Sequence, residues 1–223
     1  MRTESSTSIQ SRWAKARFQY HLLVANRDLN GLMLRFDRML AAMRMHLVQG
    51  VAPLPRSLGE IVEQAGVKSL LDVGCDRDPD FLRFLDRHLP GNVELVGVNL
   101  TGQPGRVGRI EVVLGEAADL QTLLAGRKFD LVTCNAILSH QTMMQRRHPK
   151  YPPEVDAKLI VEGGLAVLSD HQRAATIFTS YSQDSLYFSR TQFAEFGELE
   201  FSVPRFRNSL EVFHSVILTP KRK

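Results

Sequence analysis

The sequence predicts an α/β fold: a doubly wound, mostly parallel seven-stranded sheet with an antiparallel C-terminal strand, preceded by N-terminal helices. Between residues 69 and 168, short apolar runs alternate with segments whose apolar residues recur every three or four positions, which is the pattern of βαβ units. The last two apolar runs, 199–203 and 211–218, have no helical segment between them, which indicates an antiparallel pair. Before residue 50, only helical periodicity occurs.

Residues 1–50 are predicted to form a helical cap or lid, and residues 51–223 the sheet domain. A stripe of apolar residues runs from Phe18 to Met43 in steps of three and four, as on one face of a helix. Asn30 and Gly31 interrupt the stripe, so a single bent helix and a helical hairpin both fit it. The stripe either packs on the chain's own sheet domain or forms the seam of a homodimer through these N-terminal helices.

The other elements follow from apolar runs and from the residues that end them. Ser57, with Glu60 three positions later, has the spacing of a helix capping box. The pair Gly163-Gly164 is expected to stop a helix and to turn the chain into a fifth strand. The predicted strands cover 69–73, 93–98, 110–114, 129–134, 165–168, 199–203 and 211–218, and the helices between them cover 81–89, 117–124, 155–161 and 191–196.

The composition is that of a globular protein of a reducing compartment. Hydrophobic residues make up 43% and charged residues 23% of the 223 positions, which is enough apolar material for a core. The two cysteines, Cys75 and Cys134, form no CxxC pair, so neither a disulfide framework nor a zinc site is expected. The polar start has no signal-peptide core, and no apolar segment has the ~20 residues of a membrane span. We therefore expect a cytoplasmic protein without a membrane partner.

The residues after each strand are the candidates for a binding site, because ligands of doubly wound sheets bind beyond the carboxyl ends of the strands. The run Leu71-Asp72-Val73-Gly74-Cys75 ends the first strand. It resembles motif I of the class I S-adenosylmethionine-dependent methyltransferases, which reads roughly LDVGCGxG. The resemblance implies S-adenosyl-L-methionine as the cofactor, held by Asp72, Gly74 and Asp76. In this sequence Asp76 and Asp78 stand where the family usually has glycine.

Three acidic residues crowd the start of the next helix and bear on the charge of the ligand: Asp76, Asp78 and Asp80. A helix N-terminus favours an anion, but here the protein supplies its own. These carboxylates would repel a dinucleotide pyrophosphate but not a cationic sulfonium or amine, so they favour S-adenosylmethionine over NAD. Calcium loops share this spacing, but Phe81 and Arg87 stand where such a loop needs Gly and Glu, so no metal site is predicted.

Two further motifs imply cofactor contacts at the next strand ends. Asn99 follows the second strand, where the family has an acidic residue that binds both ribose hydroxyls, and Leu100 comes next. An amide oxygen accepts hydrogen bonds more weakly than a carboxylate, so a reduced affinity is expected. Glu116 and Ala117 follow the third strand and resemble the family's G-D-A element beside adenine.

The fourth strand leads into a segment that resembles the family's "FDLV…vlxH" stretch. Asn135 and Ala136 would line the methionine end of the cofactor pocket. His140 lies just beyond them, where a histidine either serves as a general base or has a structural role. The segment 159–170 resembles the family's LKPGGxLvlsD run, with Glu162 in place of the common Pro.

These resemblances imply a methyltransferase for a small-molecule acceptor, with His140 as the candidate catalytic base. An RNA-directed methyltransferase is one alternative. It would place phosphates on the Arg146-Arg147 loop and on the first 50 residues, which hold eight Lys and Arg against three Asp and Glu. Few aromatic residues lie among these basic residues, so nucleic acid is not the favoured partner. The other alternative is a methyltransferase-like binding protein that has lost catalysis, which Asp76, Asp78 and Asn99 motivate.

Overall fold

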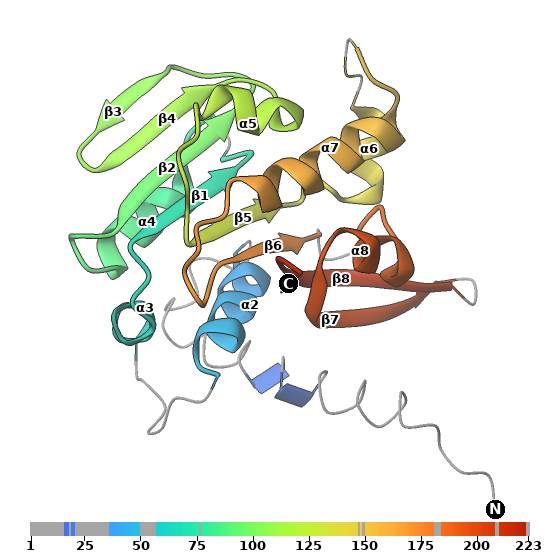
Figure 1. The fold of residues 1–223 in the computed structure, drawn as a ribbon, viewed down its shortest axis with the longest axis horizontal. Helices are drawn as coiled ribbons and strands as arrows, with labels where there is room; N and C mark the ends of the chain where they lie inside the picture. The colour runs from blue at the N-terminus through green and yellow to red at the C-terminus, as the bar shows by residue number, and fades with distance from the viewer. Residues whose placement is uncertain are drawn as a thin grey trace, which may run out of the picture.

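The computed structural model arranges helices on both faces of one mixed sheet (Figure 1). It describes residues 16–17, 19–20, 36–49, 57–75, 77–146, 148, 150–180, 184–207 and 210–221, with the backbone alone for 201–207 and 210–213. Asp76 of the predicted site and most of the predicted N-terminal cap lie outside these residues. Within the described part of the chain, no helix has the length and apolar character needed to cross a bilayer.

The sheet has eight strands in the order β3-β4-β2-β1-β5-β6-β8-β7. The chain builds outward from β1 on one side and from β5 on the other, so the sheet is doubly wound. This confirms the predicted fold class, and it is the kind of sheet that the resemblance to class I methyltransferases implies. The parallel strands are β1 (Ser69–Val73), β2 (Glu94–Asn99), β4 (Ile110–Leu114), β5 (Leu131–Asn135) and β6 (Ala175–Thr179).

The C-terminal strands form the predicted antiparallel pair. β8 (Leu210–Thr219) lies between β6 and β7 (Glu198–Arg207) and is antiparallel to both. The predicted number of strands is too low by one, because the short β3 (Gly105–Val107) pairs antiparallel with β4 at the edge of the sheet. All three residues of β3 are exposed, so no apolar run marks this strand in the sequence.

The prediction of a strand at 165–168 is wrong. The helix α7 (Pro153–Ala166) continues through Gly163 and Gly164 to residue 166, and the strand that follows is β6. A Cβ atom on Gly163 would lie 3.3 Å from Cβ of Leu120, and one on Gly164 would lie 3.1 Å from Cγ2 of Thr176. The two glycines therefore let α7 approach its neighbours closely, which is why they are tolerated inside a helix.

Helices cover both faces of the sheet (Figure 1). The side chain of Leu70 faces one helical layer and that of Leu71 the other, as the alternation of a strand requires. One layer consists of α2 (Asp37–Leu47), α3 (Leu58–Ala65) and α4 (Asp80–His88). The other consists of η1 (Ala117–Asp119), α5 (Leu120–Leu123), α6 (His140–Gln145), α7 and α8 (Arg190–Phe196).

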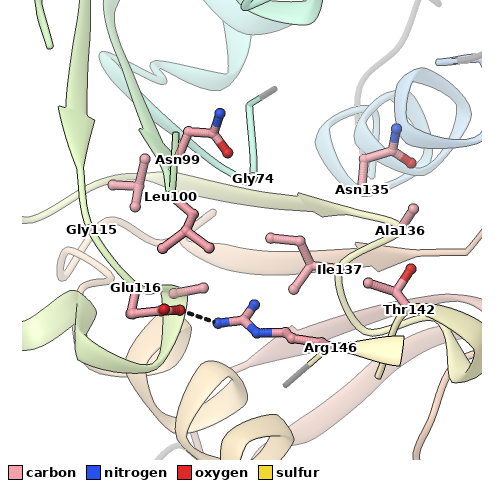
Figure 2. A pocket seen from close by; sticks show the side chains of 12 residues that line it. Gly74, Asn99, Leu100, Gly115, Glu116, Asn135, Ala136, Ile137, Thr142 and Arg146 are labelled. Carbon is pink, nitrogen blue, oxygen red and sulfur yellow. Dashed lines mark hydrogen bonds and ion pairs between the residues drawn. The ribbon is translucent and has the colours of Figure 1, made fainter. Parts of the chain in front are cut away.

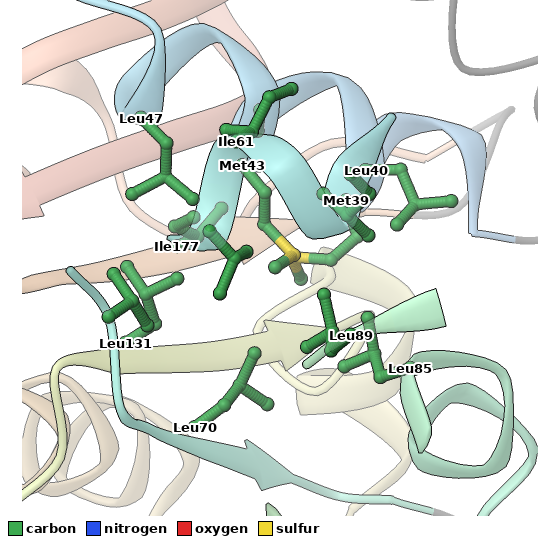
Figure 3. Packing of buried hydrophobic residues seen from close by; sticks show 14 of the residues in the cluster. Met39, Leu40, Met43, Leu47, Ile61, Leu70, Leu85, Leu89, Leu131 and Ile177 are labelled. Carbon is green, nitrogen blue, oxygen red and sulfur yellow. The ribbon is translucent and has the colours of Figure 1, made fainter. Parts of the chain in front are cut away.

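The helix α2 contributes to the hydrophobic core between the sheet and one of its helical layers. Its residues Met39 and Met43 are fully buried in the same cluster as Leu131 of β5 and Ile177 of β6 (Figure 3). The described part of the predicted apolar stripe therefore packs on the chain's own sheet. The part of the stripe before Phe36, on which the homodimer and lid predictions also rest, lies outside the described residues.

Polar contacts hold α2 at both ends. Near its start, Arg38 donates to the carbonyl oxygen of Ser180, just beyond the carboxyl end of β6, over 3.2 Å. Near its end, His46 bridges the carboxylate of Glu200 on β7 and the carbonyl oxygen of Arg173. The first turn of α2 thus lies at the carboxyl rim of the sheet and its last turn at the opposite rim.

Candidate functional site

A pocket of about 210 Å³ opens at the carboxyl ends of β1, β2, β4 and β5, where the winding of the sheet reverses. The parallel register places Val73 beside both Val98 and Cys134, so the strand ends form one rim. Seven of the nine predicted cofactor residues line this one cavity (Figure 2). The lining residues are Gly74, Val98, Asn99, Leu100, Gly115, Glu116, Ala117, Asn135, Ala136, Ile137, Thr142 and Arg146.

Gly74 makes the turn that leaves β1 and enters the pocket. Its φ of 77° lies in the left-handed region, which glycine adopts without a steric cost. Its N–H donates to the carbonyl oxygen of Val98 over 2.7 Å, which ties the turn to β2. A Cβ atom at this position would clash with the end of the Ile137 side chain. Ile137 therefore packs directly on the glycine, toward the middle of the pocket (Figure 2).

Two asparagine side chains are oriented by their neighbours. Asn99 donates through Nδ2 to the carbonyl oxygen of Thr101 over 2.7 Å, which leaves Oδ1 as the acceptor. Asn135 accepts through Oδ1 from the hydroxyl of Thr179 over 2.7 Å, which leaves Nδ2 as the donor. The pocket therefore has an acceptor at the end of β2 and a donor at the end of β5.

Ala136 is a non-glycine residue in the left-handed region, with a φ of 62°. Its N–H donates to the carbonyl oxygen of Thr179 over 2.7 Å, and this bond to β6 helps to hold the turn. Strained backbone of this kind concentrates at binding and catalytic sites, and here it directs the chain from β5 into α6 along the pocket wall.

An ionic network closes the Glu116 side of the pocket. Arg146, just beyond α6, contacts Oε2 of Glu116 through Nη2 at 2.6 Å and Oδ2 of Asp156 through Nε at 2.9 Å. Asp156 lies in the first turn of α7 with 1% of its side chain exposed. Burial raises the pKa of Asp156, although the charge of Arg146 opposes the shift.

His148 belongs to the same network. The backbone N–H groups of Lys150 and Tyr151 donate to its Nδ1 over 3.1 and 3.2 Å, so the ring proton is on Nε2. This Nε2 lies 3.9 Å from Oε2 of Glu116, and 1% of the His148 side chain is exposed. The imidazole thus directs a buried N–H group toward Glu116.

Asp72, predicted to bind the cofactor, does not line the pocket. It is buried in β1, and its Oδ1 accepts a hydrogen bond of 2.8 Å from the hydroxyl of Thr133 on β5. Burial, and then the charge of Asp72, raises the pKa of Cys75 to about 12 and raises the pKa of Cys134 as well. Both thiols therefore stay protonated near neutral pH, which makes them poor nucleophiles.

The predicted base His140 also lies outside the residues that line the pocket. It is the first residue of α6, its side chain is exposed, and its ring centroid is 5.8 Å from that of Tyr187. Two of the acidic residues beyond β1, Asp78 and Asp80, do not line the cavity either: both are exposed and contact Arg83 at 3.6 and 4.0 Å.

Five residues that line the pocket were not among the predicted site residues: Val98, Gly115, Ile137, Thr142 and Arg146. In the sequence, Arg146 stands only within a basic loop. Thr142 and Arg146 are four residues apart, so a helix in this segment places them on one face. That spacing was the available signal, because the segment follows the end of β5 directly.

No family model matches the chain, and no curated protein matches its sequence. Among solved structures it is similar to magnesium protoporphyrin IX methyltransferase from Synechocystis PCC 6803 with bound SAM, at 11% identity over 98% of this chain and 100% of that chain, with a TM-score of 0.43. It is also similar to a putative ribosomal RNA methyltransferase from Plasmodium falciparum, at 12% identity over 73% of this chain and 93% of that chain, with a TM-score of 0.41. A third similar structure is the PH0226 protein from Pyrococcus horikoshii OT3, at 13% identity over 81% of this chain and 91% of that chain, with a TM-score of 0.43. At such low identities the chemistry of the pocket has to be derived from this chain's own residues.

Proposed function

We propose that the chain is an S-adenosylmethionine-dependent methyltransferase for a small-molecule acceptor. The observation that carries this proposal is the convergence of four strand ends on one cavity. Asn99 and Asn135 are the last residues of β2 and β5, and Gly74 and Glu116 lie just after β1 and β4. All four line the pocket at the switch point of the sheet.

The polar groups of the pocket suit an adenosyl ligand with an amino-acid end. The oxygen of Asn99 accepts from a ribose hydroxyl, the carboxylate of Glu116 accepts from the amino group of the base, and Nδ2 of Asn135 donates to a carboxylate. The present volume of about 210 Å³ is below the 300 Å³ at which drug-sized ligand pockets usually begin. Ile137 and Arg146 therefore have to turn aside when such a ligand enters.

In this proposal, the bound cofactor supplies a methyl group activated by a positively charged sulfur. The chain itself positions the ligand and excludes water from it. Asn99 and Asn135 fix the two ends of the ligand, and Leu100 and Ile137 cover it with apolar surface. Methyl transfer in line between two substrates depends mainly on such positioning. His140, which is exposed at the start of α6 and does not line the pocket, is the candidate for removing a proton from an acceptor bound outside the cavity.

The surroundings of the pocket bear on the acceptor. Arg146 already faces two carboxylates, so its charge is not free to hold an acidic acceptor. One apolar side chain of the pocket lining is well exposed: Leu100, at 58%. These features favour an acceptor with apolar surface.

Calorimetric titration with S-adenosylmethionine and S-adenosylhomocysteine tests the proposal. We expect both to bind, and we expect Asn99→Ala to weaken binding about tenfold, since one hydrogen bond of about 1 kcal/mol or slightly more is lost. Asn92→Ala is the matched control, because Asn92 is exposed in the turn before β2. An absence of binding by the wild-type protein would contradict the proposal and favour a methyltransferase-like binding protein.

A further inference from the structure

Arg146 holds two carboxylates at once: Glu116, which lines the pocket, and Asp156, which is buried and does not. Glu116 and Arg146 are about one-fifth exposed, whereas Asp156 is buried. The guanidinium uses Nη2 for Glu116 and Nε for Asp156, so each carboxylate receives a single contact. Figure 2 shows the Arg146 side chain reaching along the pocket wall to Glu116.

The buried part of this network is incompletely satisfied. Among the described residues, no group donates a hydrogen bond to Oδ1 of Asp156, and the contact of Oδ2 with Arg146 lacks hydrogen-bond geometry. The Nε2–H group of His148 is likewise without an acceptor within the described part of the chain. Buried polar groups without partners destabilise the arrangement that contains them, so an arrangement that pairs them would gain stability.

We propose that Arg146 is a ligand-displaced gate: when a ligand enters, Arg146 leaves Glu116 and pairs side-on with both oxygens of Asp156. Arginine and carboxylate groups readily form such bidentate pairs, with two parallel N–H···O bonds. The exchange supplies the missing donor to Oδ1 of Asp156 and frees the carboxylate of Glu116 for a hydrogen-bond donor of the ligand. This inference rests on the proposed function, and it adds the regulation of ligand access to the same pocket.

The gate lowers the apparent affinity for the ligand, because the pocket is competent only while Arg146 is displaced. Asp156 sets how often that happens, since it holds Arg146 by two bonds in the open arrangement and by one contact in the closed one. The two residues thus act in opposite directions. Removing Arg146 opens the pocket permanently, whereas neutralising Asp156 removes the partner that stabilises the open arrangement.

Titration of the protein with S-adenosylhomocysteine tests the gate. We expect Arg146→Ala to bind at least fivefold more tightly than the wild type, and Asp156→Asn to bind at least fivefold more weakly. In the double variant the Asp156→Asn substitution should have no further effect, because it acts only through Arg146. Arg127→Ala is the matched control: Arg127 also joins two carboxylates, of Glu111 and Glu94, but does not line the pocket, so affinity should stay unchanged.

Weaker binding by both single variants would overturn the gate, and so would an effect of Asp156→Asn that persists without Arg146. Thermal unfolding of each variant distinguishes these results from a loss of fold. The double variant removes both charges of the Arg146–Asp156 pair, so it buries no unpaired charge. An absence of binding by every variant, including Arg146→Ala, would instead overturn the proposed function and the gate with it.

Discussion

At the scale of single residues, Asn99 shows how a neighbour limits what a substitution can achieve. A carboxylate in its place would accept hydrogen bonds from the ligand more strongly, but it would lose the bond to the Thr101 carbonyl and face that oxygen with a negative charge. We therefore expect Asn99→Asp to bind S-adenosylhomocysteine more tightly, by less than about tenfold. Calorimetry measures this change. Unchanged or weaker affinity would count against a ribose contact at Asn99.

Gly74 and Ile137 form a pair whose effects should not add. Gly74→Ala places a side chain at a φ of 77° and against Ile137, so we expect a loss of about 2 kcal/mol in the free energy of unfolding. The double variant Gly74→Ala/Ile137→Ala should lose less than the sum of the two single variants, because the clash is absent. Urea denaturation gives all three values. Strict additivity would mean that Ile137 does not press on the glycine.

The strand-end residues were predictable because motif positions and sheet topology place them at one rim. The strand boundaries alone were enough to predict that Asn99, Glu116 and Asn135 lie at this rim. Arg146 and Asp156 were not predictable from the same reasoning, because their contact depends on how α6 and α7 pack against each other. The burial of Asp72 likewise depends on Thr133, which lies 61 residues further along the chain.

At the scale of elements, the capping of short helices gives a direct comparison. In α8, Ser189 and Gln192 cap each other reciprocally, whereas in α3 the hydroxyl of Ser57 accepts from the Glu60 N–H. Ser189→Ala should therefore cost about 1–2 kcal/mol of unfolding free energy, and Ser57→Ala about 0.5–1 kcal/mol. Urea denaturation of both variants checks the order. A larger loss for Ser57→Ala would reverse it.

The elements that were predicted well have strong local signals, and those that were missed do not. The strands β1, β2, β4 and β5 are short, mostly apolar runs. The pair Gly163-Gly164 misled the prediction because glycine is ambiguous: it ends helices, and it also allows close packing inside them. Only the neighbours Leu120 and Thr176, distant in the sequence, decide between the two.

At the scale of the whole molecule, α2 tests the boundary predicted near residue 50. Deleting residues 1–50 removes buried side chains such as Met39 and Met43 from the core, so we expect the product to lose cooperative thermal unfolding. Deleting residues 1–11, a mostly polar segment, should leave Tm unchanged. Calorimetric unfolding measures both. A cooperative transition for residues 51–223 alone would make the N-terminal segment a separate domain.

The charge of the whole molecule argues against tight nucleic-acid binding at physiological salt. The net charge is only +4, and arginines of the described surface such as Arg109 and Arg127 already contact carboxylates. Each phosphate contact would contribute about −0.9 to the slope of log affinity against log salt concentration on duplex DNA. We expect weak binding with a shallow slope in a salt titration with RNA and DNA. A steep slope with retained affinity would favour an RNA-directed enzyme.

The closely packed glycines of α7 also have a mechanical consequence. Gly164 and Asp156 lie eight residues apart on one helix, or about 12 Å at 1.5 Å per residue. A side chain at Gly164 would press on Thr176, so Thr176 or the helix would have to shift by a few tenths of an ångström. A shift of the helix would reach Asp156, because a helix moves as a rigid unit. The position of the Asp156 carboxylate therefore depends partly on the absence of a Cβ atom at Gly164, about two helical turns away.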